Sequence, residues 1–252
     1  MIKEFSKADL ESPTLIEGFP GLGMVGKIAV SYLIKQLKAR KFAELYSPHF
    51  PYHVVVNKKG GIRLLRAELY YWKGGWRTCD LILLTGDSQA QTIDGQYEVA
   101  AKLLDFAEKY GVRRVITIGG YRSDSGEPKV MCASNSEKLL RAAEAAGARA
   151  APSGSPIVGI AGLLPGLTSF RNMEGLCLLG ETRGYLPDPL AAKKVLEVLT
   201  RLLNIPLDLS MLDEEIEKAR KLEGSIRGIE AKRALRADRL RRMEERRVSY
   251  IS

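Results

Sequence analysis

Three glycines in one short loop are the first residues of this sequence whose type and spacing could serve a chemical function, the binding of a phosphate group. Residues 21–26 spell the pattern GxGxxG between a predicted strand over residues 14–18 and a predicted helix over residues 24–38. A dinucleotide-binding loop has this context, because the bare amides at the helix N-terminus bind phosphate. Its acidic ribose partner, expected about 20 residues further on, could only be Glu44, in a segment rich in Lys and Arg. The alternative is that the glycines permit a tight turn and close packing of the helix on a sheet.

A second group of chemistry-bearing side chains lies in polar loops that follow apolar, strand-like runs. In an open α/β sheet, ligands usually bind at the carboxyl ends of the strands, where such loops gather. The group contains carboxylates and an arginine, so it predicts a pocket for a small molecule or nucleotide, although ordinary strand ends are polar as well. The candidate pocket residues are Asp87, Gln89, Tyr121, Asp124, Glu181 and Arg183.

Histidine and cysteine give little support to metal binding or nucleophilic catalysis. The two histidines, His49 and His53, have the spacing of a helical metal site, but Pro48 and Pro51 exclude a helix there. The three cysteines lie far apart and form no CxxC pair, which disfavours a zinc site and favours a reducing compartment, the cytoplasm by default. We therefore expect no metal and no cofactor.

The sequence predicts a soluble protein without a membrane span. Residues 1–10 contain no long apolar run, so no secretory signal is expected. The most apolar stretch, residues 156–167, is broken by glycine and proline and is shorter than the roughly 20 residues of a membrane helix. Asn and Gln together number only eight, and this shortage of thermolabile amides favours a thermophilic source.

Apolar runs alternate with helical periodicity through residues 14–203, which predicts an α/β fold with a mostly parallel central sheet and flanking helices. An antiparallel hairpin is expected near residues 53–72, around Gly60 and Gly61. The expected strands are residues 14–18, 42–46, 53–56, 62–72, 81–84, 115–118 and 176–179. The expected helices are residues 24–38, 93–110, 136–146, 157–164 and 189–203.

The composition changes after residue 206, so we divide the chain into a core domain, residues 1–206, and a basic helical C-terminal tail, residues 207–252. The 252-residue chain has a net charge of +9, and residues 221–247 alone hold ten basic and five acidic side chains. An acidic partner is therefore expected. Nucleic acid is disfavoured, because Tyr250 is the only aromatic residue after residue 203 and no nucleic-acid-binding motif is present.

Two stretches of sequence together resemble one family. Residues 17–26, EGFPGLGMVG, resemble the opening motif of the archaeal members of the proteasome assembly chaperone family. Residues 177–185, CLLGETRGY, followed by DPLAA at residues 188–192, resemble its second motif. The resemblance implies a phosphorylase/hydrolase-like α/β fold related to purine nucleoside phosphorylases, no established catalysis, homo-oligomers, and ATP-independent binding to the proteasome core particle.

The resemblance also implies a role for the end of the tail. Some archaeal members end in a hydrophobic-Tyr-any motif that inserts, with its terminal carboxylate, between subunits of the proteasome α ring. Here the chain ends Val-Ser-Tyr-Ile-Ser, so the tyrosine is third from the end rather than second, a shift of about 3.3 Å of extended chain. The expected partner-binding residues are Arg246, Arg247, Tyr250, Ile251 and Ser252.

Two functions follow from these observations. The leading hypothesis is a non-enzymatic proteasome assembly chaperone or core-particle adaptor, with a homo-oligomeric body and C-terminal arms that contact the α ring. The alternative is a small-molecule or nucleotide-binding enzyme related to nucleoside phosphorylases, which would use the loops at the strand ends.

Overall fold

A nine-stranded mixed sheet forms the centre of the computed structural model, which describes residues 1–75, 78–123, 128–225 and 233 of the chain. Its strand order is β1-β3-β6-β7-β2-β8-β11-β9-β10, and β4 and β5 form a separate two-stranded sheet. The strands are β1 (Ile2–Glu4), β2 (Thr14–Glu17), β3 (Arg40–Leu45), β4 (Val54–Val56), β5 (Ile62–Leu64), β6 (Ala67–Trp72), β7 (Leu81–Gly86), β8 (Arg114–Arg122), β9 (Val130–Ser134), β10 (Arg149–Ala150) and β11 (Glu174–Thr182). The helices are α1 (Val25–Gln36), α2 (Ile93–Lys109), α3 (Glu137–Ala145), α4 (Ile160–Leu167) and α5 (Pro189–Leu203), with short 3-10 turns η1 (Leu22–Met24) and η2 (Thr168–Arg171).

The parallel part of the sheet is its centre. Strands β7, β2, β8 and β11 pair in parallel, whereas β6, β3 and β1 on one side pair antiparallel with their neighbours. On the other side, β9 pairs antiparallel with β11 and in parallel with the short edge strand β10. The prediction of a mostly parallel sheet therefore holds for the central strands, and the whole sheet is mixed. The expected likeness to phosphorylases stays a prediction.

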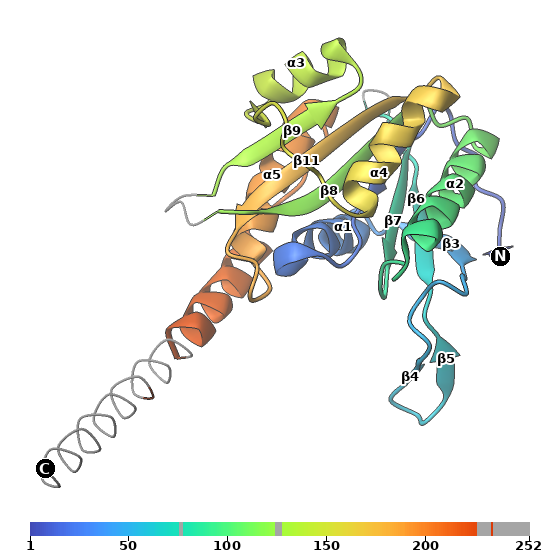
Figure 1. Ribbon diagram of the computed structural model, residues 1–252, viewed down its shortest axis with the longest axis horizontal. Helices are drawn as coiled ribbons and strands as arrows, with labels where there is room; N and C mark the ends of the chain where they lie inside the picture. The colour runs from blue at the N-terminus through green and yellow to red at the C-terminus, as the bar shows by residue number, and fades with distance from the viewer. Residues whose placement is uncertain (76–77, 124–127, 226–232, 234–252) are drawn as a thin grey trace, which may run out of the picture.

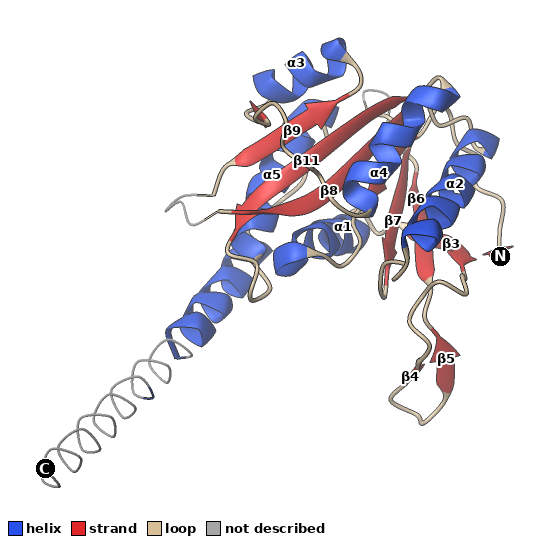
Figure 2. Ribbon diagram, in the orientation of Figure 1, coloured by secondary structure: helices blue, strands red, loops and turns tan. Residues whose placement is uncertain are grey.

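Helices cover both faces of the sheet (Figures 1 and 2). Alternate residues of each central strand point to opposite faces. In β2, Ile16 packs in the cluster that includes α1, α3 and α5, and Leu15 packs in the cluster that includes α2 and α4. The result is a three-layer α/β/α body whose central strands are buried on both sides, as apolar runs without alternation predict.

Helix starts in this layer structure use the caps that the sequence offers. The Ser136 hydroxyl accepts a hydrogen bond from the Leu139 amide, the typical contact of a serine N-cap. The Asp188 carboxylate accepts one from the Ala191 amide, and Pro189 occupies the first turn of α5. These local signals place the starts of α3 and α5 correctly.

The predicted strand over residues 62–72 is wrong, because the structure divides it in two. β5 pairs with β4 in a hairpin outside the main sheet, whereas β6 joins the main sheet between β3 and β7. The division lies at Leu65 and Arg66, where Leu65 is buried in the core and the Arg66 amide donates a hydrogen bond to the Asp87 carboxylate. A contact with a distant part of the chain therefore ends the strand.

The segment after residue 206 begins by packing on the body. The Tyr32 hydroxyl donates a hydrogen bond to the carbonyl of Asp208, and a helix runs from residue 211 to residue 225, the end of the continuously described chain. Leu212 and Ile216 of this helix are buried, whereas Leu222 is exposed. The body thus covers the apolar side chains at the start of this helix, and the helix projects away from the sheet beyond them (Figure 1).

Candidate functional site

The two motifs that carry the family resemblance meet at the carboxyl ends of β2, β8 and β11. The amide of Asp188, just before α5, donates a hydrogen bond of 2.8 Å to the carbonyl of Gly23 in the glycine loop. The Thr182 hydroxyl donates to the Asp188 carboxylate over 2.7 Å and accepts from the Gly184 amide over 3.1 Å. Residues about 160 positions apart in the sequence therefore form one junction, with the starts of α1 and α5 side by side.

The glycine spacing of this junction is set by backbone packing. A Cβ atom on Gly26 would lie 2.2 Å from the Ile118 carbonyl oxygen, and one on Gly18 would lie 2.2 Å from the Gly26 carbonyl oxygen. Gly23 has a φ of +60°, in the left-handed region that favours glycine. Gly23 and Gly26 of the pattern GxGxxG thus serve the tight turn and the close packing of α1 on the sheet, whereas a Cβ atom on Gly21 would meet only the Gln89 side chain, at 3.7 Å.

Exposed side chains cover the outside of the junction and form what we call the edge surface, namely Leu22, Arg122, Arg183 and Tyr185. Tyr185 is 78% exposed, and the Arg122 guanidinium lies 4.8 Å from the centroid of its ring. Arg183 forms an ion pair with Glu223 of the C-terminal helix, with an N–O distance of 2.8 Å. Tyrosine and arginine are enriched among the residues that dominate binding energy in protein interfaces. The edge surface therefore carries residue types that are common at protein interfaces, and the Arg183–Glu223 ion pair links it to the C-terminal helix.

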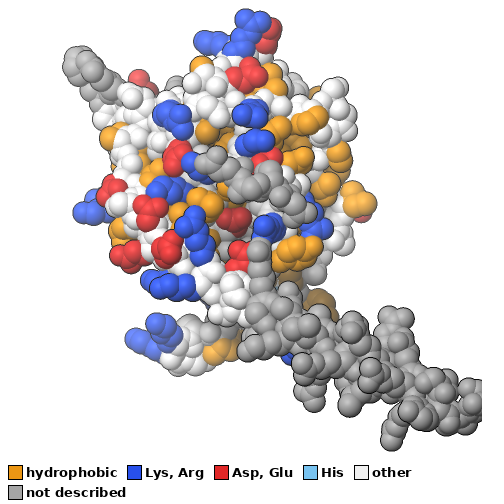
Figure 3. Space-filling model, turned by 90° about the vertical axis from the view of Figure 1, so that its left-hand side faces the viewer, with side chains coloured by type: hydrophobic (Ala, Val, Ile, Leu, Met, Phe, Trp, Pro, Cys, Tyr) orange, Lys and Arg blue, Asp and Glu red, His pale blue; other side chains and the backbone are white. Residues whose placement is uncertain are grey.

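Charged side chains on the described side of the body are mixed rather than gathered by sign. Figure 3 looks onto the side from which the C-terminal helix leaves and shows basic and acidic side chains interspersed there. A mixed surface of this kind does not present the continuous basic stripe typical of nucleic-acid binding. Figure 3 therefore shows no basic stripe on this side of the described body.

Two of the predicted pocket residues, Asp87 and Gln89, lie in the loop after β7 and hold other segments in place. Asp87 binds the Arg63 guanidinium through both carboxylate oxygens, at 2.5 and 2.9 Å. Burial disfavours the ionised form of Asp87 and by itself would raise its pKa. The hydrogen bonds from Arg63 and the Arg66 amide favour the ionised form more strongly, so the pKa of Asp87 is lowered. Gln89 donates to the carbonyl of Pro20 and accepts from the amide of Ile160.

The other predicted pocket residues lie at the ends of β8 and β11. Tyr121 and Glu181 face each other across the two strands, and Arg183 follows on the same chain segment. Glu181 is buried and accepts a hydrogen bond of 3.0 Å from the Lys129 amide. Asp124 lies outside the described residues. The structure thus places the predicted residues at one sheet edge in two separate groups, and the pocket stays a prediction.

Glu17 is a buried residue of the first motif that sequence reasoning did not single out as a candidate site residue. Its side chain is completely buried, one carboxylate oxygen accepts a 2.7 Å hydrogen bond from the Phe19 amide, and the other has no partner among the described residues. Burial raises the pKa of Glu17 to about 8. Its only signal in the sequence is a carboxylate at the end of an apolar strand.

Thr117 and Cys177 continue the buried polar row that Glu17 begins. Thr117 of β8 lies opposite Glu17 of β2 on one side and opposite Cys177 of β11 on the other. Burial raises the pKa of Cys177 to about 12. The Cys177 thiol therefore stays protonated at neutral pH and is not an activated nucleophile.

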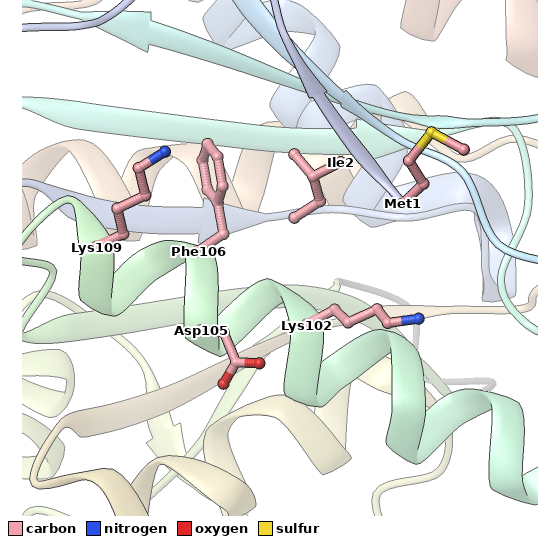
Figure 4. A pocket seen from close by; sticks show the side chains of 6 residues that line it. All are labelled: Met1, Ile2, Lys102, Asp105, Phe106 and Lys109. Atoms are coloured by element: carbon pink, nitrogen blue, oxygen red, sulfur yellow. The ribbon is translucent and has the colours of Figure 1, made fainter.

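A hollow of about 320 Å³ lies elsewhere, between β1 and α2 (Figure 4). Met1, Ile2 and Phe106 form its apolar part, and its charged groups already have partners in the protein: Lys109 binds Glu4, and Asp105 binds Arg171. Figure 4 shows these side chains pointing in different directions rather than converging on one point. The hollow therefore lacks the convergent polar groups of a ligand site.

The described residues hold neither a metal cluster nor a membrane span. No group of three or more His, Cys, Asp or Glu side chains in the described ranges could hold a metal ion. His49 instead lies 2.7 Å from the Glu98 carboxylate, and His53 is exposed. None of the described helices has the length and apolar character needed to cross a bilayer. The predicted contact residues Arg246, Arg247, Tyr250, Ile251 and Ser252 lie outside the described residues.

Comparison with known proteins gives consistent matches over nearly the whole chain. The chain is 36% identical over 223 residues to the uncharacterized protein MJ1210 of Methanocaldococcus jannaschii, which covers 85% of each protein. Its structure is similar to that of Pyrococcus furiosus PbaB, an archaeal proteasome activator, with a TM-score of 0.86 and 40% identity over 90% of this chain and 98% of that chain. It is also similar to Pyrococcus furiosus PbaA, an archaeal homolog of proteasome-assembly chaperone, with a TM-score of 0.73 and 26% identity over 97% and 98% of the two chains. Because the model of the PAC2 family matches residues 15–224 as well, this chain belongs to the PAC2 family.

Proposed function

We propose that this chain is a non-enzymatic proteasome assembly chaperone or core-particle adaptor in the cytoplasm of a thermophilic archaeon. Its body is a homo-oligomer, and its C-terminal arm contacts the α ring of the core particle. The observation that carries this proposal is the 40% identity, over 90% of the chain, to PbaB, an archaeal proteasome activator. The likeness to PbaA, a homolog of proteasome-assembly chaperone, supports the same function.

The arrangement of the sheet edge supports this proposal physically. The edge surface and the C-terminal helix are joined by the ion pair between Arg183 and Glu223, so a partner that binds the arm also meets Tyr185. Residues 221–247 carry a net charge of +5, which would speed the approach to an acidic partner and help to orient the arm. The polar groups of Asp87, Gln89 and Glu181 hold loops together, and no contact described above favours the enzymatic alternative.

Co-sedimentation with an archaeal proteasome core particle tests the function. We expect the full chain to sediment with the core particle and a chain truncated after Ser225 to lose this binding. Truncation at this point keeps Leu212 and Ile216 on the body, so an unchanged melting temperature serves as the folding control. Failure of the full chain to bind contradicts the proposed function, and equal binding of both chains contradicts the role of the arm.

The edge surface gives a second prediction for the same assay. Replacing Tyr185 with alanine should weaken binding to the core particle about tenfold, because a tyrosine at a contact centre contributes roughly 1–2 kcal/mol. The change should leave stability unaffected, since Tyr185 is 78% exposed. Phe170→Ala is the matched control, because Phe170 is 85% exposed and lies after α4, at the amino edge of the sheet. Equal affinities of Tyr185→Ala and the unmodified chain would exclude the edge surface from the contact.

A further inference from the structure

The hairpin formed by β4 and β5 stands outside the body with an uncovered aliphatic face. Its register pairs Val54 with Leu64 and Val56 with Ile62, which places all four side chains on one face. They are 43%, 61%, 64% and 72% exposed, respectively. Figure 1 shows the hairpin projecting beyond the ends of β3 and β6. An isolated two-stranded hairpin is marginally stable in water, and exposed apolar patches of this kind mark interaction sites.

The body holds this hairpin in a fixed orientation from its other face. Val55 packs against the core, and Arg63 binds the Asp87 carboxylate at the end of β7. Leu65 is buried directly after β5. The hairpin is therefore anchored at its base, and its aliphatic face points away from these anchors because alternate strand residues face opposite sides.

The hairpin is also basic, which restricts its partner. Residues 45–67 contain four Lys and Arg residues and no Asp or Glu. Arg63 and Arg66 are paired with carboxylates, whereas Lys58 and Lys59 at the tip are exposed and form no ion pair with any described residue. The hairpin thus fits a surface that combines exposed apolar groups with unpaired carboxylates.

The start of the C-terminal helix has this complementary chemistry. Residues 208–217 contain five Asp and Glu residues and no Lys or Arg. Glu214 and Glu215 are exposed and form no ion pair within the described chain, and Met211 beside them is 49% exposed. Leu222, about two turns after Glu215 in the same helix, is 53% exposed.

The two complementary segments are anchored on different sides of one molecule. The hairpin is fixed to the end of β7, whereas residues 208–217 are fixed to α1 through the Tyr32 hydroxyl and Gln36. In Figure 1 the hairpin projects at the lower right of the body, and the C-terminal helix leaves it at the lower left. They can therefore meet only between two copies of the chain. Contact between two different surfaces of identical subunits forms a ring when the rotation from one subunit to the next closes.

We infer that the β4–β5 hairpin of one copy binds the acidic segment 208–217 of a second copy and is the subunit contact of the homo-oligomer. The aliphatic face supplies the buried area, and Lys58 and Lys59 pair with Glu214 and Glu215. This inference rests on the homo-oligomer of the proposed function and names the surface that forms it.

The molar mass in solution, measured by light scattering after size exclusion, tests the contact. We expect the full chain to have a multiple of its 27.9 kDa subunit mass and Ile62→Lys to weaken association at least about 30-fold, because a lysine would be buried in an apolar contact. Phe170→Lys is the matched control and should keep the oligomeric mass, since Phe170 is 85% exposed and lies outside both segments. A monomeric full chain, or an unchanged mass for Ile62→Lys, overturns the inference.

A charge exchange identifies the acceptor surface. Lys58→Glu with Lys59→Glu should dissociate the oligomer, and adding Glu214→Lys with Glu215→Lys should restore it. Failure of the fourfold variant to reassociate overturns the assignment of segment 208–217. Core-particle binding is measured in parallel: if Ile62→Lys keeps its mass but loses this binding, the hairpin contacts the core particle and the inference is wrong. If the full chain forms the oligomer through the hairpin but never binds the core particle, only the proposed function fails.

Discussion

Replacing Gly26 with alanine should destabilise the protein by about 3 kcal/mol or more, a large part of the 5–15 kcal/mol that holds a typical domain folded. The new methyl group would lie 2.2 Å from the Ile118 carbonyl oxygen and 3.1 Å from the Gly18 Cα atom. Both are backbone atoms of central strands or their direct continuation, so neither can move without displacing the sheet. Helix propensity favours alanine by only about 1 kcal/mol, and the clash therefore decides the sign.

Urea denaturation of Gly26→Ala and Gly224→Ala measures this effect against a matched control. Gly224 also lies in a helix, but a Cβ atom there meets nothing within 4 Å. Gly224→Ala should therefore leave the free energy of unfolding unchanged or raise it by about 0.5–1 kcal/mol. A Gly26→Ala protein as stable as the unmodified chain would show that α1 can move off the sheet, contrary to the packing described here.

The central elements could be predicted from the sequence because their signals are local. The run at residues 81–84 is apolar without alternation, and such a run predicts a strand covered on both faces. α2 and α5 have helical periodicity together with a capping residue at their starts, Thr92 and Asp188. Periodicity and capping depend on neighbouring residues only, so they can be recognised without knowledge of the fold.

The edges of the sheet could not be predicted because distant contacts decide them. β9, at Val130–Ser134, pairs with β11 more than 40 residues further along the chain and carries no clear pattern of its own. The end of β5 likewise depends on the contact between Arg66 and Asp87, which are 21 residues apart. Pairings over such separations are set by the packing of the whole sheet.

The candidate site was predictable as a location but not as a set of contacts. The polar loops after the apolar runs do lie at the carboxyl edge, as the rule for α/β sheets requires. The partners of these side chains are nonetheless remote in sequence: Gln89 binds the amide of Ile160, 71 residues away. Similarly, Glu17 is buried because helices pack on both faces of β2 between β7 and β8. The local sequence shows only that a carboxylate stands at the end of an apolar strand.

Because the Glu17 carboxyl is buried, the free energy of unfolding should fall as the pH rises through the neutral range. The pKa of Glu17 is about 8 in the folded state against an ordinary value of 4.5, because burial disfavours its charge. A raised folded pKa means that the stabilising contribution is fully present below pH 4.5 and is lost as the pH rises through 8. Asp87 and Glu68 have lowered pKa values in the folded state, and their ordinary values are 3.8 and 4.5, so they add little slope above pH 5.

We expect the free energy of unfolding to fall by about 2–4 kcal/mol between pH 5 and pH 8.5, since each pH unit contributes at most about 1.4 kcal/mol per proton. Glu17→Gln should abolish most of this slope, because glutamine keeps the shape and the hydrogen bond from the Phe19 amide but does not ionise. Glu68→Gln is the control and should keep the slope, since Glu68 is already ionised at pH 5. Denaturant unfolding of the three proteins at several pH values measures the difference. A Glu17→Gln protein with the slope of the unmodified chain would mean that another group carries the titration, and that the Glu17 carboxyl ionises inside the folded protein at little cost.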